Sequence, residues 1–130
     1  MFVTDTHAIT YYAGRKYSRL SRRSLRLFEE AEAAKVVIYV PTVALWEITG
    51  LIKSGLVELP SRFDRWCREL ERKAGFVVEP LFWSDIHEAR SLPFRDPFDC
   101  LIAGTAIRLG FPLITKDQVI ADSGLVETVW

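Results

Sequence analysis

The sequence predicts an α/β protein in which helices cover both faces of a mostly parallel sheet. Short runs rich in β-branched residues occur five times, at residues 2–4, 36–40, 76–78, 113–115 and 126–129. Longer segments of helical period separate most of these runs, and this alternation is typical of a parallel sheet between helices. Because crossover connections are right-handed, the topology is a doubly wound sandwich or a close relative. In that fold the carboxyl ends of the strands gather at one edge, where ligands bind.

The size and composition of the chain fit one soluble domain. Its 130 residues contain no repeat and no linker rich in Pro, Gly or Ser, so we expect a single domain over residues 1–130. The 17 basic and 17 acidic side chains cancel, so a polyanionic partner would need a local basic patch. Cys67 and Cys100 form no zinc or disulfide pattern, and no signal peptide or membrane span is visible. We therefore expect a cytoplasmic protein.

The first predicted strand, residues 2–4, is followed directly by an acid. Asp5 and then Thr6 stand at the carboxyl end of this strand, which is the edge where ligands bind. Taken alone, Asp5 is also explained as a turn residue or a helix cap.

The helix expected after Pro41 contains a carboxylate that packing does not explain. A helical projection places Glu47 between Val43 and Leu51, within an apolar arc that also includes Ala44, Ile48 and Ile52. A carboxylate in an apolar arc is unfavourable unless something compensates it. An arginine partner, a raised pKa or a metal ion would each do so, and this helix alone does not choose among them.

The segment RDPFDCLIAGTAIRLGFPLITKD, residues 95–117, contains one apolar helix with two aspartates at its start. Pro97 suits the first helical position, so we interpret Asp96 as the cap and Asp99 as an acid of the first turn. Apolar residues at helical spacing follow, and Gly110 predicts the end of the helix. Asp99 lies at the margin of the apolar stripe, where it can face a cleft between helix and sheet.

A further carboxylate follows the next strand. Asp117 comes two residues after the run at 113–115, again at a carboxyl edge, although a turn also explains it. The predicted fold thus sends four acids from four elements to one edge: Asp5, Glu47, Asp99 and Asp117. Four carboxylates in one cleft repel one another, and a hard divalent cation would keep them ionised. Oxygen ligands favour Mg²⁺ or Mn²⁺, which activates water and neutralises charge on a phosphate, so phosphodiester hydrolysis is the natural chemistry.

Five motifs carry a family likeness: VTDTHA, PTVALWEITGLIKSGLVELP, RDPFDCLIAGTA, LITKD and VETVW. Together they resemble PIN-domain ribonucleases, most closely VapC-type toxins of toxin–antitoxin pairs, over residues 2–130. The resemblance implies a three-layer α/β/α sandwich with a five-stranded sheet, and endonucleolytic cleavage of RNA by metal-activated water. It also implies that one or two Mg²⁺ or Mn²⁺ ions are held by the four acids selected above: Asp5, Glu47, Asp99 and Asp117.

The same resemblance implies further residues and partners. Thr6 and Thr115 resemble hydroxyl residues that support the family site, although a cap or a turn also explains them. A homodimer and a cognate antitoxin that blocks the site are expected. Many relatives have arginine where Cys100 stands and alanine where Gly104 stands, which bears on substrate handling or rigidity rather than on chemistry. Glycine costs a helix about 1 kcal/mol relative to alanine, so Gly104 reflects either a close backbone approach or drift.

A basic segment near the amino terminus is the best candidate for RNA contact. No acid occurs between Tyr11 and Phe28, and phosphate contacts would give a neutral protein a route to RNA. A solvated face explains such a segment equally well. The candidates are Arg15, Lys16, Arg19, Arg22 and Arg23.

Other residues are given structural interpretations. The face formed by Arg65, Arg68 and Arg72 is interleaved with acids and is interpreted as solvated. The three internal tryptophans, Trp46, Trp66 and Trp83, are expected to pack in the core or in a dimer interface. His7 and His87 are interpreted as structural, because metal-activated water does not require them.

Two other classes of function compete with the nuclease. A catalytically inert PIN-like module for RNA or protein binding is one, and the presence of all four acids argues against it. A phospho-accepting signalling domain is the other. It would need paired acids after the first strand, whereas Thr6 and His7 follow Asp5.

Overall fold

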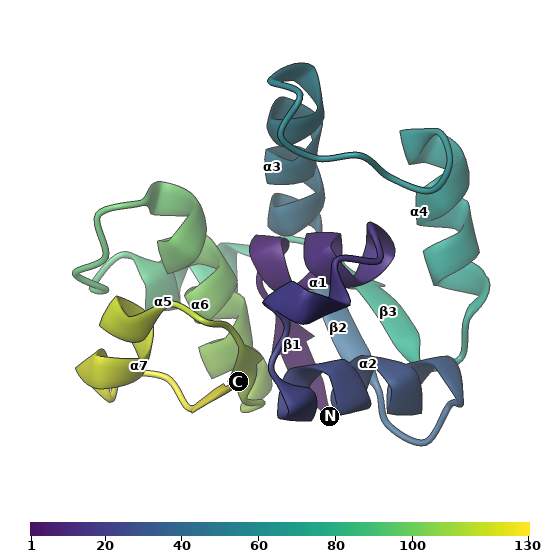
Figure 1. Cartoon of the computed structure of the whole chain (residues 1–130). Coiled ribbons are helices and arrows are strands. Elements are labelled where there is room, and N and C mark those ends of the chain that lie inside the picture. The colour runs from purple at the N-terminus through teal and green to yellow at the C-terminus, as the bar shows by residue number, and fades with distance from the viewer.

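The computed structural model describes all 130 residues and shows an entirely parallel five-stranded sheet between helices (Figure 1). The strands are β1 (Phe2–Thr4), β2 (Ile38–Pro41), β3 (Phe76–Glu79), β4 (Leu113–Ile114) and β5 (Thr128–Val129), in the order β3-β2-β1-β4-β5. The helices are α1 (Thr6–Ala13), α2 (Arg22–Glu32), α3 (Thr42–Lys53), α4 (Phe63–Arg72), α5 (Trp83–Ala89), α6 (Pro97–Leu109) and α7 (Gln118–Ser123), with a 3-10 turn, η1 (Tyr17–Arg19). The predicted three-layer α/β/α sandwich is confirmed.

Each predicted run overlaps a strand, but four of the five strands begin or end elsewhere because pairing decides their length, and the pair Pro41–Glu79 extends β2 and β3 by one residue each. The run at 36–40 pairs only from Ile38, since its neighbour β1 begins at Phe2, the residue opposite Ile38. The runs at 113–115 and 126–129 shorten to two residues each, because Leu113 pairs with Thr128 and the ladder ends one pair later. Hydrophobicity alone does not show where a partner strand stops.

Two apolar clusters fill the faces of the sheet. One packs α1, α2 and α4 on the sheet through residues such as Ile9, Phe28 and Trp66. The other packs α6 and α7 on the opposite face, with Ile102 and Ile120 among its buried residues. No helix in the fold combines the length and apolar character needed to cross a bilayer. That residues 1–130 form one domain stays a prediction.

The predicted packing of the tryptophans in the core or in a dimer interface is confirmed, as core packing, for one of the three. Trp66 is 5% exposed in the cluster beneath α4. Trp46 and Trp83 are 67% and 78% exposed, so neither belongs to the core of this chain. Helical period places a residue on a face but does not show whether another element covers that face, and the outer sides of α3 and α5 are uncovered.

Gly104 allows α6 to lie against α5. A Cβ atom on Gly104 would stand 2.5 Å from the carbonyl oxygen of Asp85 and 3.1 Å from Cβ of Ala89. No side chain fits that space without moving α5, so a close backbone approach, rather than drift, explains this glycine. The contact fixes the position of α6, whose first turn carries Asp99.

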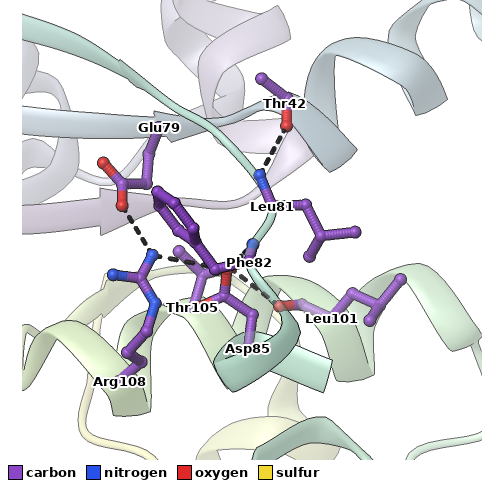
Figure 2. Close-up of polar contacts among 8 residues, drawn as sticks. All are labelled: Thr42, Glu79, Leu81, Phe82, Asp85, Leu101, Thr105 and Arg108. Carbon is purple, nitrogen blue, oxygen red and sulfur yellow. Dashed lines mark hydrogen bonds and ion pairs between the residues drawn. The ribbon is translucent and has the colours of Figure 1, made fainter. Parts of the chain in front are cut away.

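A buried ionic network joins α5 and α6 to the end of β3 (Figure 2). The Arg108 guanidinium donates to Glu79 at 2.6 Å and to the fully buried Asp85, and it lies 4.8 Å from the centre of the Phe82 ring. Asp85 also accepts the backbone N–H of Phe82 at 2.8 Å, at the start of α5. Hydrogen bonding to Asp85 raises the pKa of Arg108. We did not predict this network, because its members are far apart in sequence.

Candidate functional site

Three helices begin at one cavity, and an aspartate caps each of them. Asp5, Asp96 and Asp117 precede α1, α6 and α7, and all three line a cavity of about 380 Å³. Each accepts backbone N–H groups with its Oδ1 atom, from Ala8 at 2.7 Å, from Phe98 at 2.8 Å, and from Val119 and Ile120 at 2.8 and 3.2 Å. Helix amino ends carry partial positive charge, so this arrangement favours anions.

Asp99 is the carboxylate in this cavity that the fold leaves without a partner. It is half-buried in the first turn of α6 and accepts no hydrogen bond from the protein. Burial and then the charges of Asp96, Asp117, Glu47 and Asp5 raise its pKa to about 7. Without a cation, the carboxyl groups around the cavity therefore cannot all ionise easily at neutral pH, as expected of an acidic functional site.

Among the acids of this cavity Asp5 is the most deeply buried, with an exposed fraction of 7%. Burial raises its pKa, while hydrogen bonds from the Thr115 hydroxyl and the Ala8 N–H oppose that rise. The Thr115 hydroxyl also accepts the backbone N–H of Asp117 at 3.1 Å. Thr115 therefore links the acid after β1 to the acid after β4, which agrees with a supporting role.

Glu47 lies beside this group rather than within it. It lines a neighbouring cavity of about 730 Å³, and the two cavities share Asp96. The Thr6 hydroxyl donates a hydrogen bond to Glu47 Oε1, and Glu47 forms no ion pair, which removes the arginine partner from the three alternatives. Glu47 is only half-buried, since the apolar arc of α3 ends earlier than expected and Ile52 is exposed.

The donor set fits a hard divalent cation, although the carboxylates line the walls of the cavity and do not meet at one position. No three His, Cys, Asp or Glu side chains converge closely enough to hold one ion in this conformation. The acids around the cavity offer only oxygen, and the Oδ2 atoms of Asp96 and Asp117 accept no hydrogen bond from the protein. Oxygen donors that repel one another are the ligands that Mg²⁺ and Mn²⁺ take.

A model of the PIN domain matches residues 2–124. The chain belongs to the PIN domain family. Among curated proteins none matches the chain. The PIN domain also shares its fold with solved structures at TM-scores of 0.64 to 0.69.

Three such structures cover nearly the whole PIN domain. The first is a toxin–antitoxin complex from Klebsiella pneumoniae, with TM-score 0.66, 16% identity and coverage of 100% of this chain and 97% of that one. The second is VapBC2 from Rickettsia felis bound to a DNA fragment from their promoter, with TM-score 0.69, 14% identity and coverage of 99% and 98%. The third is FitAcB from Neisseria gonorrhoeae, with TM-score 0.64, 16% identity and coverage of 100% and 97%.

The five basic residues predicted to contact RNA lie in different parts of the PIN domain. Lys16 and Arg19 line a cavity of about 210 Å³ that shares His7 with the acidic cavity. Arg15 lines a different groove, beside Trp66. Arg22 and Arg23 begin α2, which lies beside the amino terminus, at the other end of β1 from α1 (Figure 1). Only two of the five therefore adjoin the acids.

Three residues of the acidic cavity were missed or understated by the sequence patterns. Asp96 caps α6 as predicted, but it also lines both cavities, and after burial its charge is the largest cause of the raised pKa of Asp99. Lys116, between the strand end and Asp117, lines the same cavity. His7 is exposed and stands between the acidic and the basic cavities, so it is not a packing residue. The available signal was the position of His7 and Lys116 shortly after β1 and β4, and that of Asp96 at the amino end of α6.

Proposed function

We propose that this PIN domain is a metal-dependent endoribonuclease of VapC type, the toxin of a toxin–antitoxin pair. One observation carries the proposal: the unpaired Asp99 carboxylate shares a cavity with Asp5, Asp96 and Asp117 where three helices begin. Membership of the PIN family, whose VapC-type members are nucleases, supports the activity. Two of the three structural neighbours are a toxin–antitoxin complex and VapBC2, and this likeness supports the toxin assignment.

The residues divide the work of such a site. Asp5, Glu47, Asp99 and Asp117 would hold Mg²⁺ or Mn²⁺, which supplies activated water and neutralises charge on the phosphate. Thr6 orients the Glu47 carboxylate through its hydrogen bond, and Thr115 orients Asp5 and Asp117. The amino ends of α1, α6 and α7 offset part of the negative charge of the aspartates that cap them. RNA phosphodiesters are the proposed substrate.

The proposal includes protein partners. A cognate antitoxin is supported by the toxin–antitoxin complexes among the neighbours. A homodimer is supported by large apolar side chains that the chain leaves exposed around α3 and α5: Trp46, Leu81, Phe82, Trp83 and Ile86. Such side chains are enriched where proteins associate. The cytoplasm is the proposed location, since a blocked toxin must meet its RNA there.

The test is cleavage of end-labelled transfer, ribosomal and messenger RNAs by purified, antitoxin-free protein. We expect discrete fragments with Mn²⁺, none with chelator, and none with Asp99→Asn. Asp64→Asn is the matched control, because Asp64 is an exposed acid on α4 that pairs only with surface arginines. Intact RNA in every lane with folded wild-type protein would refute the nuclease.

Metal binding gives an independent readout. Isothermal titration with Mn²⁺ should show binding that Asp5→Asn weakens strongly and Asp64→Asn does not change. An inert binding module has no reason to hold Mn²⁺ at a site that depends on Asp5. Absence of cleavage, together with Mn²⁺ binding that Asp5→Asn leaves unchanged, would therefore favour the inert module.

A further inference from the structure

Two cationic side chains converge on one buried tyrosine next to the acidic cavity. Lys116 donates a hydrogen bond to the Tyr11 hydroxyl at 2.7 Å, and its Nζ atom lies 4.8 Å from the centre of the Tyr11 ring. The Arg19 guanidinium lies 5.6 Å from the same ring. Tyr11 itself is only 8% exposed, so its position is fixed by packing. The chain therefore holds both cations in place through a rigid aromatic platform.

Local structure explains how these residues meet. Tyr11 lies in the last turns of α1, and the chain then folds back, with the backbone N–H of Lys16 donating to the Tyr11 carbonyl at 2.8 Å. The η1 turn follows and brings Arg19 over the ring. Lys116 arrives separately, from the carboxyl end of β4. Two unrelated segments thus deliver positive charge to the same place.

These cations are not neutralised by the protein. None of Lys16, Arg19 and Lys116 is within 4.0 Å of a carboxylate oxygen, whereas Arg65, Arg68 and Arg108 all form ion pairs. Glu58 is the acid among the residues that line the basic cavity, and it pairs with none of them. Burial raises the pKa of Tyr11, but hydrogen bonds and charge from Lys116 and Arg19 outweigh burial and lower it. The local field therefore favours negative charge.

The position of these cations relative to the acidic cavity suggests which anion they bind. Lys116 and His7 line the acidic cavity, while His7, Lys16 and Arg19 line the basic one, so the two cavities adjoin at His7. A strand whose phosphate occupies the acidic cavity would pass His7 and present a neighbouring phosphate to the cations. Single-stranded nucleic acid is held in this way, by cations on the backbone beside aromatic side chains.

We propose that Lys116, Arg19 and the Tyr11 hydroxyl, with Lys16, form a subsite for the RNA phosphate adjacent to the cleaved bond. The inference rests on the proposed nuclease function for its choice of RNA. Tyr11 accepts from Lys116 and keeps its own proton to donate to a phosphate oxygen. Arg15, Arg22 and Arg23 lie outside the subsite.

The experiment measures binding separately from cleavage. A fluorescein-labelled single-stranded RNA of mixed sequence is titrated with protein in chelator, by anisotropy, over a series of salt concentrations. Each lost phosphate contact on a single strand lowers the slope of log affinity against log salt by about 0.7. We expect Lys116→Gln and Arg19→Gln each to reduce the slope by about that amount and to weaken binding several-fold at low salt. Tyr11→Phe, which keeps the ring, should weaken binding less.

Arg68→Gln is the matched control, since Arg68 is an exposed arginine already paired with Asp64. Arg19 is exposed, so its substitution should leave the fold intact, and a thermal melt checks this. With metal, the subsite variants should raise KM for RNA more than they lower kcat. If both cation variants retain the affinity and salt slope of the control, the subsite is wrong even where wild type cleaves RNA. Salt-dependent binding through Lys116 and Arg19 without any wild-type cleavage would support the subsite and refute the nuclease.

Discussion

Replacing Asp99 with asparagine should make the metal-free protein more stable, by an amount that grows with pH. The pKa of Asp99 is about 7 in the folded chain against an ordinary 3.8. Between those values the folded state keeps a proton that the unfolded state loses, so ionisation favours unfolding. Wild-type stability should therefore fall as pH rises from about 4 to about 7 and should level off above that range. Asparagine carries no charge and is free of this effect.

The magnitude follows from the pKa difference. At about 1.4 kcal/mol per pKa unit, the upper limit is about 4 kcal/mol above pH 7. Asp99 is only half-buried, so water and ions screen its charge, and we expect about half of the limit, roughly 2 kcal/mol at pH 8. At pH 5.5, about half-way between the two pKa values, the difference between the two proteins should be about half of that at pH 8, or roughly 1 kcal/mol.

The assay is urea unfolding of wild type and Asp99→Asn in chelator at pH 5.5 and pH 8. Mn²⁺ should then stabilise wild type far more than the variant, because a ligand that binds only the folded state raises its stability by mass action. A variant that is equally or less stable than wild type at pH 8 without metal would show that the carboxylates around Asp99 do not repel it as described.

Two contrasts test the scaffold that holds α6. Gly104→Ala should destabilise the protein by about 1–2 kcal/mol, since the cost of overpacking against the α5 backbone exceeds the helical preference for alanine. Gly50 has open space around it, so Gly50→Ala should stabilise the protein by up to about 1 kcal/mol in the same urea assay. Arg108→Met should cost about 3 kcal/mol by leaving buried Asp85 unpaired, and Arg68→Met should change the unfolding free energy by less than about 0.5 kcal/mol. Equal effects within either pair would contradict the packing described.

Much of the fold was readable because its signals are local. Asp96, Pro97 and Gly110 predicted the start and end of α6, and the structure confirms the cap and a left-handed Gly110 with φ of 71°. The order of strands and helices predicted the parallel sheet, and the fold then placed Asp5, Asp99 and Asp117 in one cavity. These predictions needed only turn chemistry, periodicity and the rule that parallel strands end at one edge.

Contacts between distant segments were not readable. The ion pair of Arg108 with Asp85 joins residues of two helices, and the exposure of Trp46 and Trp83 depends on which helix faces lack a neighbour. The meeting of Lys116 with Tyr11 spans nearly the whole chain. Each depends on three-dimensional packing that no local pattern encodes.

The sequence by itself therefore determined the α/β class, the helix caps and the acids that reach the carboxyl edge of the sheet, because each follows from short-range backbone chemistry and a single topological rule. Only the tertiary structure decided that Glu47 bonds Thr6 in an adjoining cavity, that Asp96 both caps and lines the site, and that two of five basic candidates adjoin the acids. Distances across a fold are set by how whole elements pack, and a pKa such as that of Asp99 depends on those distances and on burial.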